Sequence, residues 1–183
     1  MKKLMLVIVA SLLSLSVQGI AMAKAPVPFE ATIEVVVTDG GTVVAAGNRT
    51  RTTGEIIQGT VVYSPQWTDL QGAAITVNHN SNTRIDPNTG EILDGHAHAT
   101  FEIVKVVGGA VVGTIAGNYR SKIGGSLVTG FSDEGRWNLV KATGVFARIQ
   151  SHGTWNAWMS PVVLGDPPVS TYAGLATLSG TYH

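Results

Sequence analysis

Two histidines and a glutamate stand at a spacing that could bind a metal ion. His96 and His98 are two residues apart, and Glu102 follows further along the same run. In a β-strand these side chains project from one face, with neighbours in the row roughly 6 to 7 Å apart. Imidazole and carboxylate groups are common ligands of Mn, Fe, Ni and Zn ions. The spacing therefore defines a candidate site for a divalent transition metal.

The opposite face of the same strand favours a different interpretation. Ala97, Ala99, Phe101 and Ile103 form a continuous apolar row. One of the two rows must face the core, and Phe and Ile are buried much more often than His and Glu. The polar row then faces solvent in an ordinary amphipathic strand, and the protein needs no cofactor.

The surroundings of the two histidines also resemble the first cupin motif. The matching pattern is Gly90, five residues, His96-x-His98, three residues, Glu102, six residues and Gly109. This resemblance implies that the two histidines and the glutamate hold the metal. The second cupin motif, a Pro-x-Gly turn followed by the histidine that completes the site, is missing, because only the spacing of His152 and Asn156 matches it.

The elements that position these residues are predicted to be β-strands. The chain has 22 glycines among 183 residues and is rich in Val, Ile and Thr, which suits pleated strands separated by turns. Period-two alternation recurs, whereas no stretch after residue 23 keeps the apolar spacing of an amphipathic helix. About nine strands are expected, near residues 29–38, 59–64, 73–79, 95–107, 111–119, 126–131, 136–141, 151–158 and 174–182.

Short connections between these strands predict an antiparallel meander. Glycine-containing turns are expected at residues 39–41, 108–109, 124–125 and 133–135. Longer loops are expected at 81–93 and 161–170, because their prolines cannot donate to a strand ladder. Closure of the sheet removes its exposed edges. The expected fold is thus all-β, a single antiparallel β-barrel of about eight to nine strands.

Residues 113–158 resemble a known barrel group. The shared motifs are Gly113-Thr114-Ile115-Ala116-Gly117, Gly135-Arg136-Trp137, Ala142-Thr143-Gly144-Val145-Phe146-Ala147-Arg148-Ile149 and Gly153-Thr154-Trp155. They are similar to the allene oxide cyclase and dirigent-like barrels, in which a Thr-Gly-x-Phe corner leads into a Gly-Thr-aromatic strand. The resemblance implies a calycin-like barrel whose lumen accepts a small apolar molecule. It also permits a cofactor-free cyclase or isomerase.

Large aromatic residues are the candidates for lining this lumen and binding a small apolar ligand: Phe101, Tyr119, Trp137, Phe146 and Trp155. A cyclase or isomerase would also need an acid, a base or a polar group that orients the substrate. Its candidates are Glu30, Glu34, Tyr63 and Tyr119.

Other polar clusters carry weaker signals. Asn78-His79-Asn80 stands at an expected strand end, where Asn serves turn geometry. Asn118, Arg120 and Lys122 could place polar groups at a barrel mouth. No nucleophile elbow and no phosphate-binding glycine loop is found, so hydrolase and nucleotide-binding functions lack support.

The N-terminal residues 1–23 are predicted to be a signal peptide. Lys2 and Lys3 precede the apolar run 4–17, and Ala21-Met22-Ala23 fits a cleavage site. As a helix this run would rise about 21 Å, short of the roughly 30 Å hydrocarbon core. We expect one domain, residues 24–183, exported to the periplasm or the medium without a membrane anchor.

Charge and cysteine content narrow the partners. Without Lys2 and Lys3, 10 basic residues remain of 12, against 12 acidic ones, so the net charge is −2. No basic run is present, which disfavours nucleic-acid binding. Cysteine is absent, so an exported chain depends on its hydrophobic core rather than on disulfides.

Overall fold

The computed structural model describes residues 25–150, 152–165 and 169–183. The predicted signal peptide lies outside the described residues, as do residue 151 and residues 166–168 of the predicted loop at 161–170. The described part contains nine strands and one three-residue 3-10 helix, η1. It contains no helix that is long and apolar enough to cross a membrane. The all-β prediction is confirmed.

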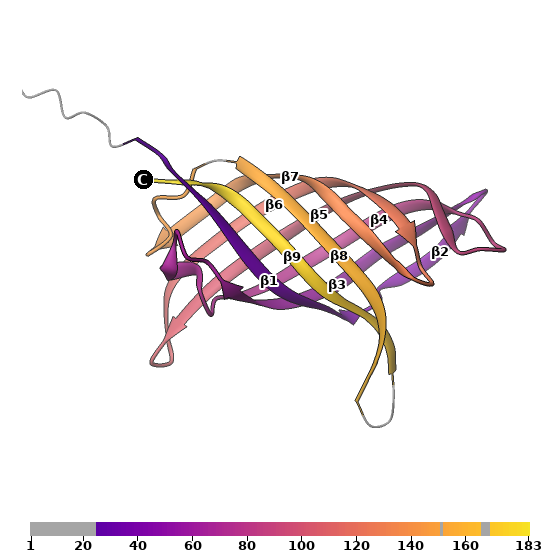
Figure 1. Ribbon diagram of the computed structural model, residues 1–183, viewed down its shortest axis with the longest axis horizontal. Coiled ribbons are helices and arrows are strands. Elements are labelled where there is room, and N and C mark those ends of the chain that lie inside the picture. Colours follow the sequence, from indigo (N-terminus) through magenta and orange to yellow (C-terminus); the bar gives the residue numbers. More distant parts are fainter. Residues whose placement is uncertain (1–24, 151, 166–168) are drawn as a thin grey trace, which may run out of the picture.

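Eight of the strands close into an antiparallel barrel (Figure 1). The order around the ring is β1-β9-β8-β7-β6-β5-β4-β3, and a pairing between β3 and β1 closes it. The ninth strand, β2, extends the sheet by pairing with the start of β3. The elements are β1 Val27–Asp39, β2 Thr42–Ala46, β3 Arg49–Tyr63, η1 Thr68–Leu70, β4 Ala74–Ile85, β5 Glu91–Val107, β6 Ala110–Ser126, β7 Gly130–Gly144, β8 His152–Leu164 and β9 Val169–Tyr182.

Two of the predicted turns are wrong. Gly124-Gly125 belongs to β6 and Asp133-Glu134-Gly135 belongs to β7, because the chain reverses between Ser126 and Gly130. The expected strand at 126–131 is therefore mostly this reversal. Gly135 does not form a turn but allows β7 to approach β6 closely, since a Cβ there would lie 2.0 Å from the carbonyl oxygen of Arg120.

The strands are also longer than the sequence predicts. β3 begins at Arg49, ten residues before the expected start, and β4 continues to Ile85. Most of the predicted loop at 81–93 is thus strand, and only the turn around Pro87 connects β4 to β5. These extensions build the end of the barrel that carries the pocket described below.

Aromatic side chains close the opposite end of the barrel, which lies on the left in Figure 1. The connection between β3 and β4 places Trp67 and Leu70 inside this end, and both are buried. The Trp67 ring stacks on Tyr182 with centroids 4.8 Å apart, and it meets Phe29 and Phe146 edge-on. We call this packed end the capped end.

Trp137 fills the middle of the barrel against two glycines. It is 1% exposed, and its Nε1 donates a hydrogen bond of 3.0 Å to the carbonyl of Ser179. A Cβ on Gly153 would lie 2.6 Å from the indole and 1.9 Å from that carbonyl oxygen. A Cβ on Gly180 would lie 2.8 Å from the same ring. Small residues on neighbouring strands therefore make room for the large one.

We expect Gly153→Ala to lower the free energy of unfolding by about 1–3 kcal/mol, the usual cost of overpacking a core. Urea unfolding followed by circular dichroism measures it. Gly40→Ala is the control, because a Cβ at Gly40 meets nothing within 4 Å. Equal stability of the two variants would show that the packing of the Trp137 indole does not require a glycine at position 153.

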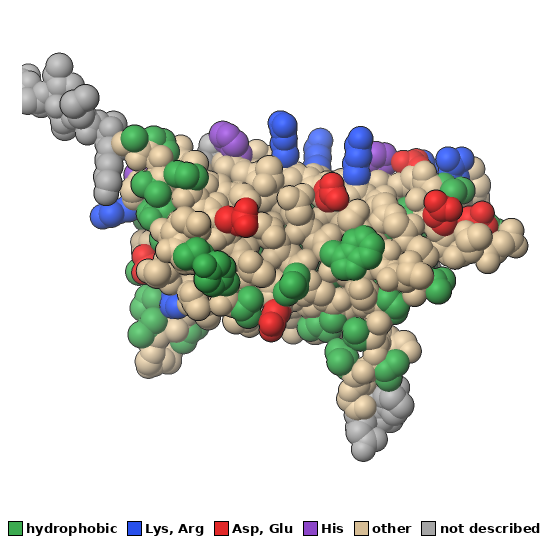
Figure 2. Space-filling model, viewed as in Figure 1, with side chains coloured by type: hydrophobic (Ala, Val, Ile, Leu, Met, Phe, Trp, Pro, Cys, Tyr) green, Lys and Arg blue, Asp and Glu red, His purple; other side chains and the backbone are tan. Residues whose placement is uncertain are grey.

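The outer wall of the barrel is mixed in character. Figure 2 shows charged and apolar side chains scattered over one face, with Lys and Arg side chains projecting along one edge. The inner row of each strand is mostly apolar, and it supplies the core from Ala31, Ile33, Ile75, Ile103 and Ile115, which are all at most 2% exposed.

Candidate functional site

A pocket of about 690 Å³ opens into the lumen at the end away from the cap. This end carries the β4–β5, β6–β7 and β8–β9 connections. Apolar side chains form much of its wall, among them Val37, Ile92, Ile123, Leu127, Phe131 and Tyr172. The volume lies within the range of about 300–1,000 Å³ that is typical of small-molecule sites.

His79 lies at the deep end of this pocket, on the inner face of β4. It continues the buried row of Ile75 and Val77, and its side chain is 5% exposed. Its Nδ1 lies 2.5 Å from Oε2 of Glu55 on the neighbouring strand β3. A buried imidazole needs such a partner, because an unpaired polar group in a core is costly.

A β-bulge in β3 brings Glu55 to the inner wall. The register of β3 against β4 shifts between Thr52 and Glu55. Gly54, which lies within the shift, has a φ of 73°, and its N–H donates to the side-chain oxygen of Asn80 at 3.0 Å. An added residue reverses which side chains face inward. The Glu55 side chain, 18% exposed, thereby reaches His79.

Asp133 approaches His79 from the other side of the lumen. β4 and β7 are separated in the sheet by β5 and β6, so this approach crosses the interior. His79 Nε2 lies 3.9 Å from Asp133 Oδ2, too far for a hydrogen bond. The Tyr119 hydroxyl donates to that same oxygen at 3.0 Å. We call Glu55, His79, Asp133 and Tyr119 the lumen network.

The environment of the lumen network sets the protonation of its members. Burial alone would lower the pKa of His79, but the hydrogen bond to Glu55 and the charges of Asp133 and Glu55 outweigh it and raise that pKa above its ordinary value. Burial, aided by Asp133, raises the pKa of Tyr119 well above its ordinary value, so this phenol stays a neutral donor. Perturbed groups in a cleft are typical of functional sites.

Four buried side-chain nitrogen or oxygen atoms of the described residues have no hydrogen-bond partner: His79 Nε2, Asp133 Oδ1, Ser121 Oγ and Trp155 Nε1. Buried polar groups are nearly always hydrogen-bonded, to protein or to water. The first three come from residues that face the lumen at the level of the network or next to it. Of these three residues only His79 lines the pocket, and Asp133 and Ser121 face the lumen beyond it.

No family model, curated protein or solved structure matches this chain. The resemblance to the allene oxide cyclase and dirigent-like barrels, like the partial one to cupins, stays a prediction. The function must therefore be argued from the pocket and the lumen network.

The five aromatic residues predicted to line a ligand site face the interior, but none of them lines this pocket. Phe101 meets Trp137 edge-on with centroids 6.2 Å apart, and Tyr119 stacks on Trp155 at 5.5 Å. Phe146 belongs to the capped end. These rings pack on one another and fill the lumen beyond the network. Their contact with a ligand stays a prediction.

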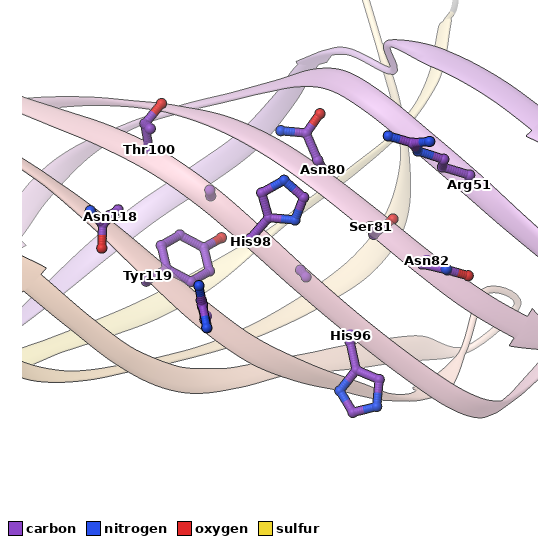
Figure 3. Close-up of a pocket in the computed structure, with 12 residues that line it drawn as sticks. Arg51, Asn80, Ser81, Asn82, His96, His98, Thr100, Asn118 and Tyr119 are labelled. Carbon is purple, nitrogen blue, oxygen red and sulfur yellow. The ribbon is translucent and has the colours of Figure 1, made fainter.

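The row of His96, His98 and Glu102 lies on the outer wall of β5, and all three residues are exposed. Figure 3 shows both histidines projecting from the strand, with His98 beside Asn80 and His96 further along. His96 Nε2 lies 3.2 Å from Oδ1 of Asp94. Among the described residues, no group of three or more His, Cys, Asp or Glu side chains is placed to hold a metal ion. The row forms part of the exposed surface.

Most of the polar candidates for a cyclase also face outward. Glu30, Glu34 and Tyr63 are exposed, so their prediction as lumenal groups is wrong. Tyr119 faces the lumen. Asn118, Arg120 and Lys122 are exposed along β6 rather than gathered at the mouth of the pocket.

Two members of the lumen network, Asp133 and Glu55, are not predicted from the sequence. Asp133 alternates with Phe131, Gly135 and Trp137, a period-two row that indicates an inward carboxylate, but its Asp-Glu-Gly triplet resembles a turn. Glu55 continues the inward row of Ile57 and Val61, but it lies before the start of the predicted strand at residue 59. His79 does have one, as the third member of an otherwise apolar row.

Proposed function

We propose that this protein is exported and binds a small apolar molecule in the pocket at the open end of its barrel. The observation that carries the proposal is a lumen packed solid at the capped end and hollow, with largely apolar walls, at the other. Export is proposed from the predicted signal peptide.

The mouth of the pocket supports this proposal. Leu127, Phe131 and Tyr172 are only partly buried although they are large and mostly apolar. The rings of Phe131 and Tyr172 meet edge-on at 5.1 Å, and the Tyr172 hydroxyl donates to the Leu127 carbonyl at 3.1 Å, which holds this wall in place. A ligand that covers these side chains gains roughly 25 cal/mol for each Å² of apolar surface removed from water.

Titration with a neutral fluorescent probe, N-phenyl-1-naphthylamine, tests the proposal. We expect a saturable rise in fluorescence with one site per chain. Leu127→Asp should weaken binding at least about tenfold, equal to about 1.4 kcal/mol, because it places a charge in the apolar wall.

Val128→Asp is the matched control, because it puts the same charge in the same turn on a side chain that is 65% exposed and outside the pocket. It should leave the affinity unchanged. A wild-type protein that shows no saturable binding, or a Leu127→Asp variant that binds as well as the control, would contradict the proposal.

One observation favours a second function, a cofactor-free cyclase or isomerase. His79 is held by Glu55 through Nδ1, while its Nε2 has no hydrogen-bond partner. An imidazole oriented in this way is suited to general acid–base catalysis. Native mass spectrometry of the protein and of His79→Gln, both from the exporting host, tests it. Identical copurifying molecules would speak for binding alone, and chemically different ones for turnover.

A further inference from the structure

Carboxylates dominate the charge at the deep end of the pocket. Glu55 lines the pocket on one side of the imidazole of His79, and Asp133 lies on the other side. No Lys or Arg is found among the described residues that line the pocket. With both carboxylates ionised, even a protonated His79 leaves the lumen network with a net charge of −1.

The unpartnered atoms restrict what can bind there. Asp133 Oδ2 already accepts from Tyr119, whereas Asp133 Oδ1 is buried without a hydrogen-bond partner, in the lumen just beyond the residues that line the pocket. An ionised carboxylate can only accept hydrogen bonds, so a group that binds at Oδ1 must donate one. The Ser121 hydroxyl on the neighbouring strand β6 is also buried without a partner, and it can donate or accept. A carboxylate or phosphate head would have no proton to give, and it would be repelled by two like charges.

We infer that the ligand is an amphiphile whose head donates hydrogen bonds and is not anionic, an alcohol or a primary amine, held by the carboxylates on either side of His79, Glu55 and Asp133, with its apolar tail toward the mouth. This inference rests on the proposed binding function of the pocket. A fatty acid, which has a similar tail but an anionic head, is therefore expected to bind more weakly. The pocket thus selects by head-group charge as well as by apolar area.

Competition among three probes with the same alkyl chain tests the inference. Decanol, decylamine and decanoate are each used to displace N-phenyl-1-naphthylamine from the wild-type protein at neutral pH. We expect decylamine and decanol to displace it at concentrations at least about tenfold lower than decanoate. Equal potency of the three, with the fluorescent probe bound, would overturn the head-group inference and leave the binding function standing. Failure of every probe to bind would overturn both.

Asp133→Asn adds a test of the contact itself. The amide oxygen can still accept from Tyr119, while the negative charge is lost. We expect the affinity for decylamine to fall about tenfold and the preference over decanoate to shrink. Glu134→Gln is the matched control, because it removes the same charge from the next residue, whose side chain is exposed on the other face of β7. Should the two variants bind decylamine equally well, Asp133 does not contact the head. If Asp133→Asn does not fold, the competition of decanol, decylamine and decanoate on the wild-type protein still tests the inference.

Discussion

Replacing Trp137 by alanine is expected to lower the free energy of unfolding by about 3–5 kcal/mol, the usual cost of removing a large aromatic side chain from a core. The indole is buried at the centre of the barrel, contacts Phe101 and donates its N–H to the Ser179 carbonyl. Its neighbours Gly153 and Gly180 have no side chains that could move in to fill the space. The variant therefore keeps a cavity and loses a buried hydrogen bond.

Trp158→Ala is the control for this prediction. Trp158 lies on β8 like Trp155 but faces outward and is 52% exposed, so its removal should change the free energy of unfolding by no more than about 0.5 kcal/mol. Urea unfolding followed by circular dichroism measures both variants without relying on tryptophan emission. Equal costs at the two positions would show that the centre of the barrel is not the packed layer described above.

The sequence predicts the barrel because alternation is strong wherever inner residues are large. The row Ala97, Ala99, Phe101 and Ile103 shows which face of β5 points inward. Prediction fails where a turn-like glycine motif, Gly124-Gly125 or Asp133-Glu134-Gly135, occurs inside a strand. At Gly125 and Gly135 the sequence pattern is that of a turn, but Gly125 lies near the end of β6 with a φ of 104°, and Gly135 allows a close approach between strands. Local sequence does not separate these uses of glycine.

The site is less predictable than the fold, for two reasons. His79 is visible as a polar residue in an apolar row, but its partner Glu55 lies before the start of the predicted strand, and only the pairing of β3 with β4 places it opposite His79. The location of the pocket depends on which end is capped. That is decided by Trp67, which lies in a connection between strands and packs on residues from both ends of the described chain, Phe29 and Tyr182.

His79→Leu is expected to destabilise the protein by about 3–5 kcal/mol at mildly acidic pH, the usual cost of removing one partner from a buried ion pair. The groups that face His79 are Glu55 on β3, Asp133 on β7 and Tyr119 on β6. Tyr119 is neutral, so the variant leaves two carboxylates without a cation between them. His98→Leu is the control, since His98 is exposed on the outer wall.

The pH dependence gives this prediction its sign. The pKa of His79 is raised in the folded state, so the folded protein holds a proton that the unfolded chain releases near the ordinary value of 6.5. The resulting stabilisation is complete below that value and is lost as the pH rises through the folded pKa. The wild-type protein should therefore lose free energy of unfolding relative to His79→Leu as the pH rises from about 6 toward 9. Parallel curves for the two proteins would mean that folding leaves the pKa of His79 at its ordinary value, and a relative gain of the wild type with rising pH would mean that burial keeps His79 neutral in the barrel.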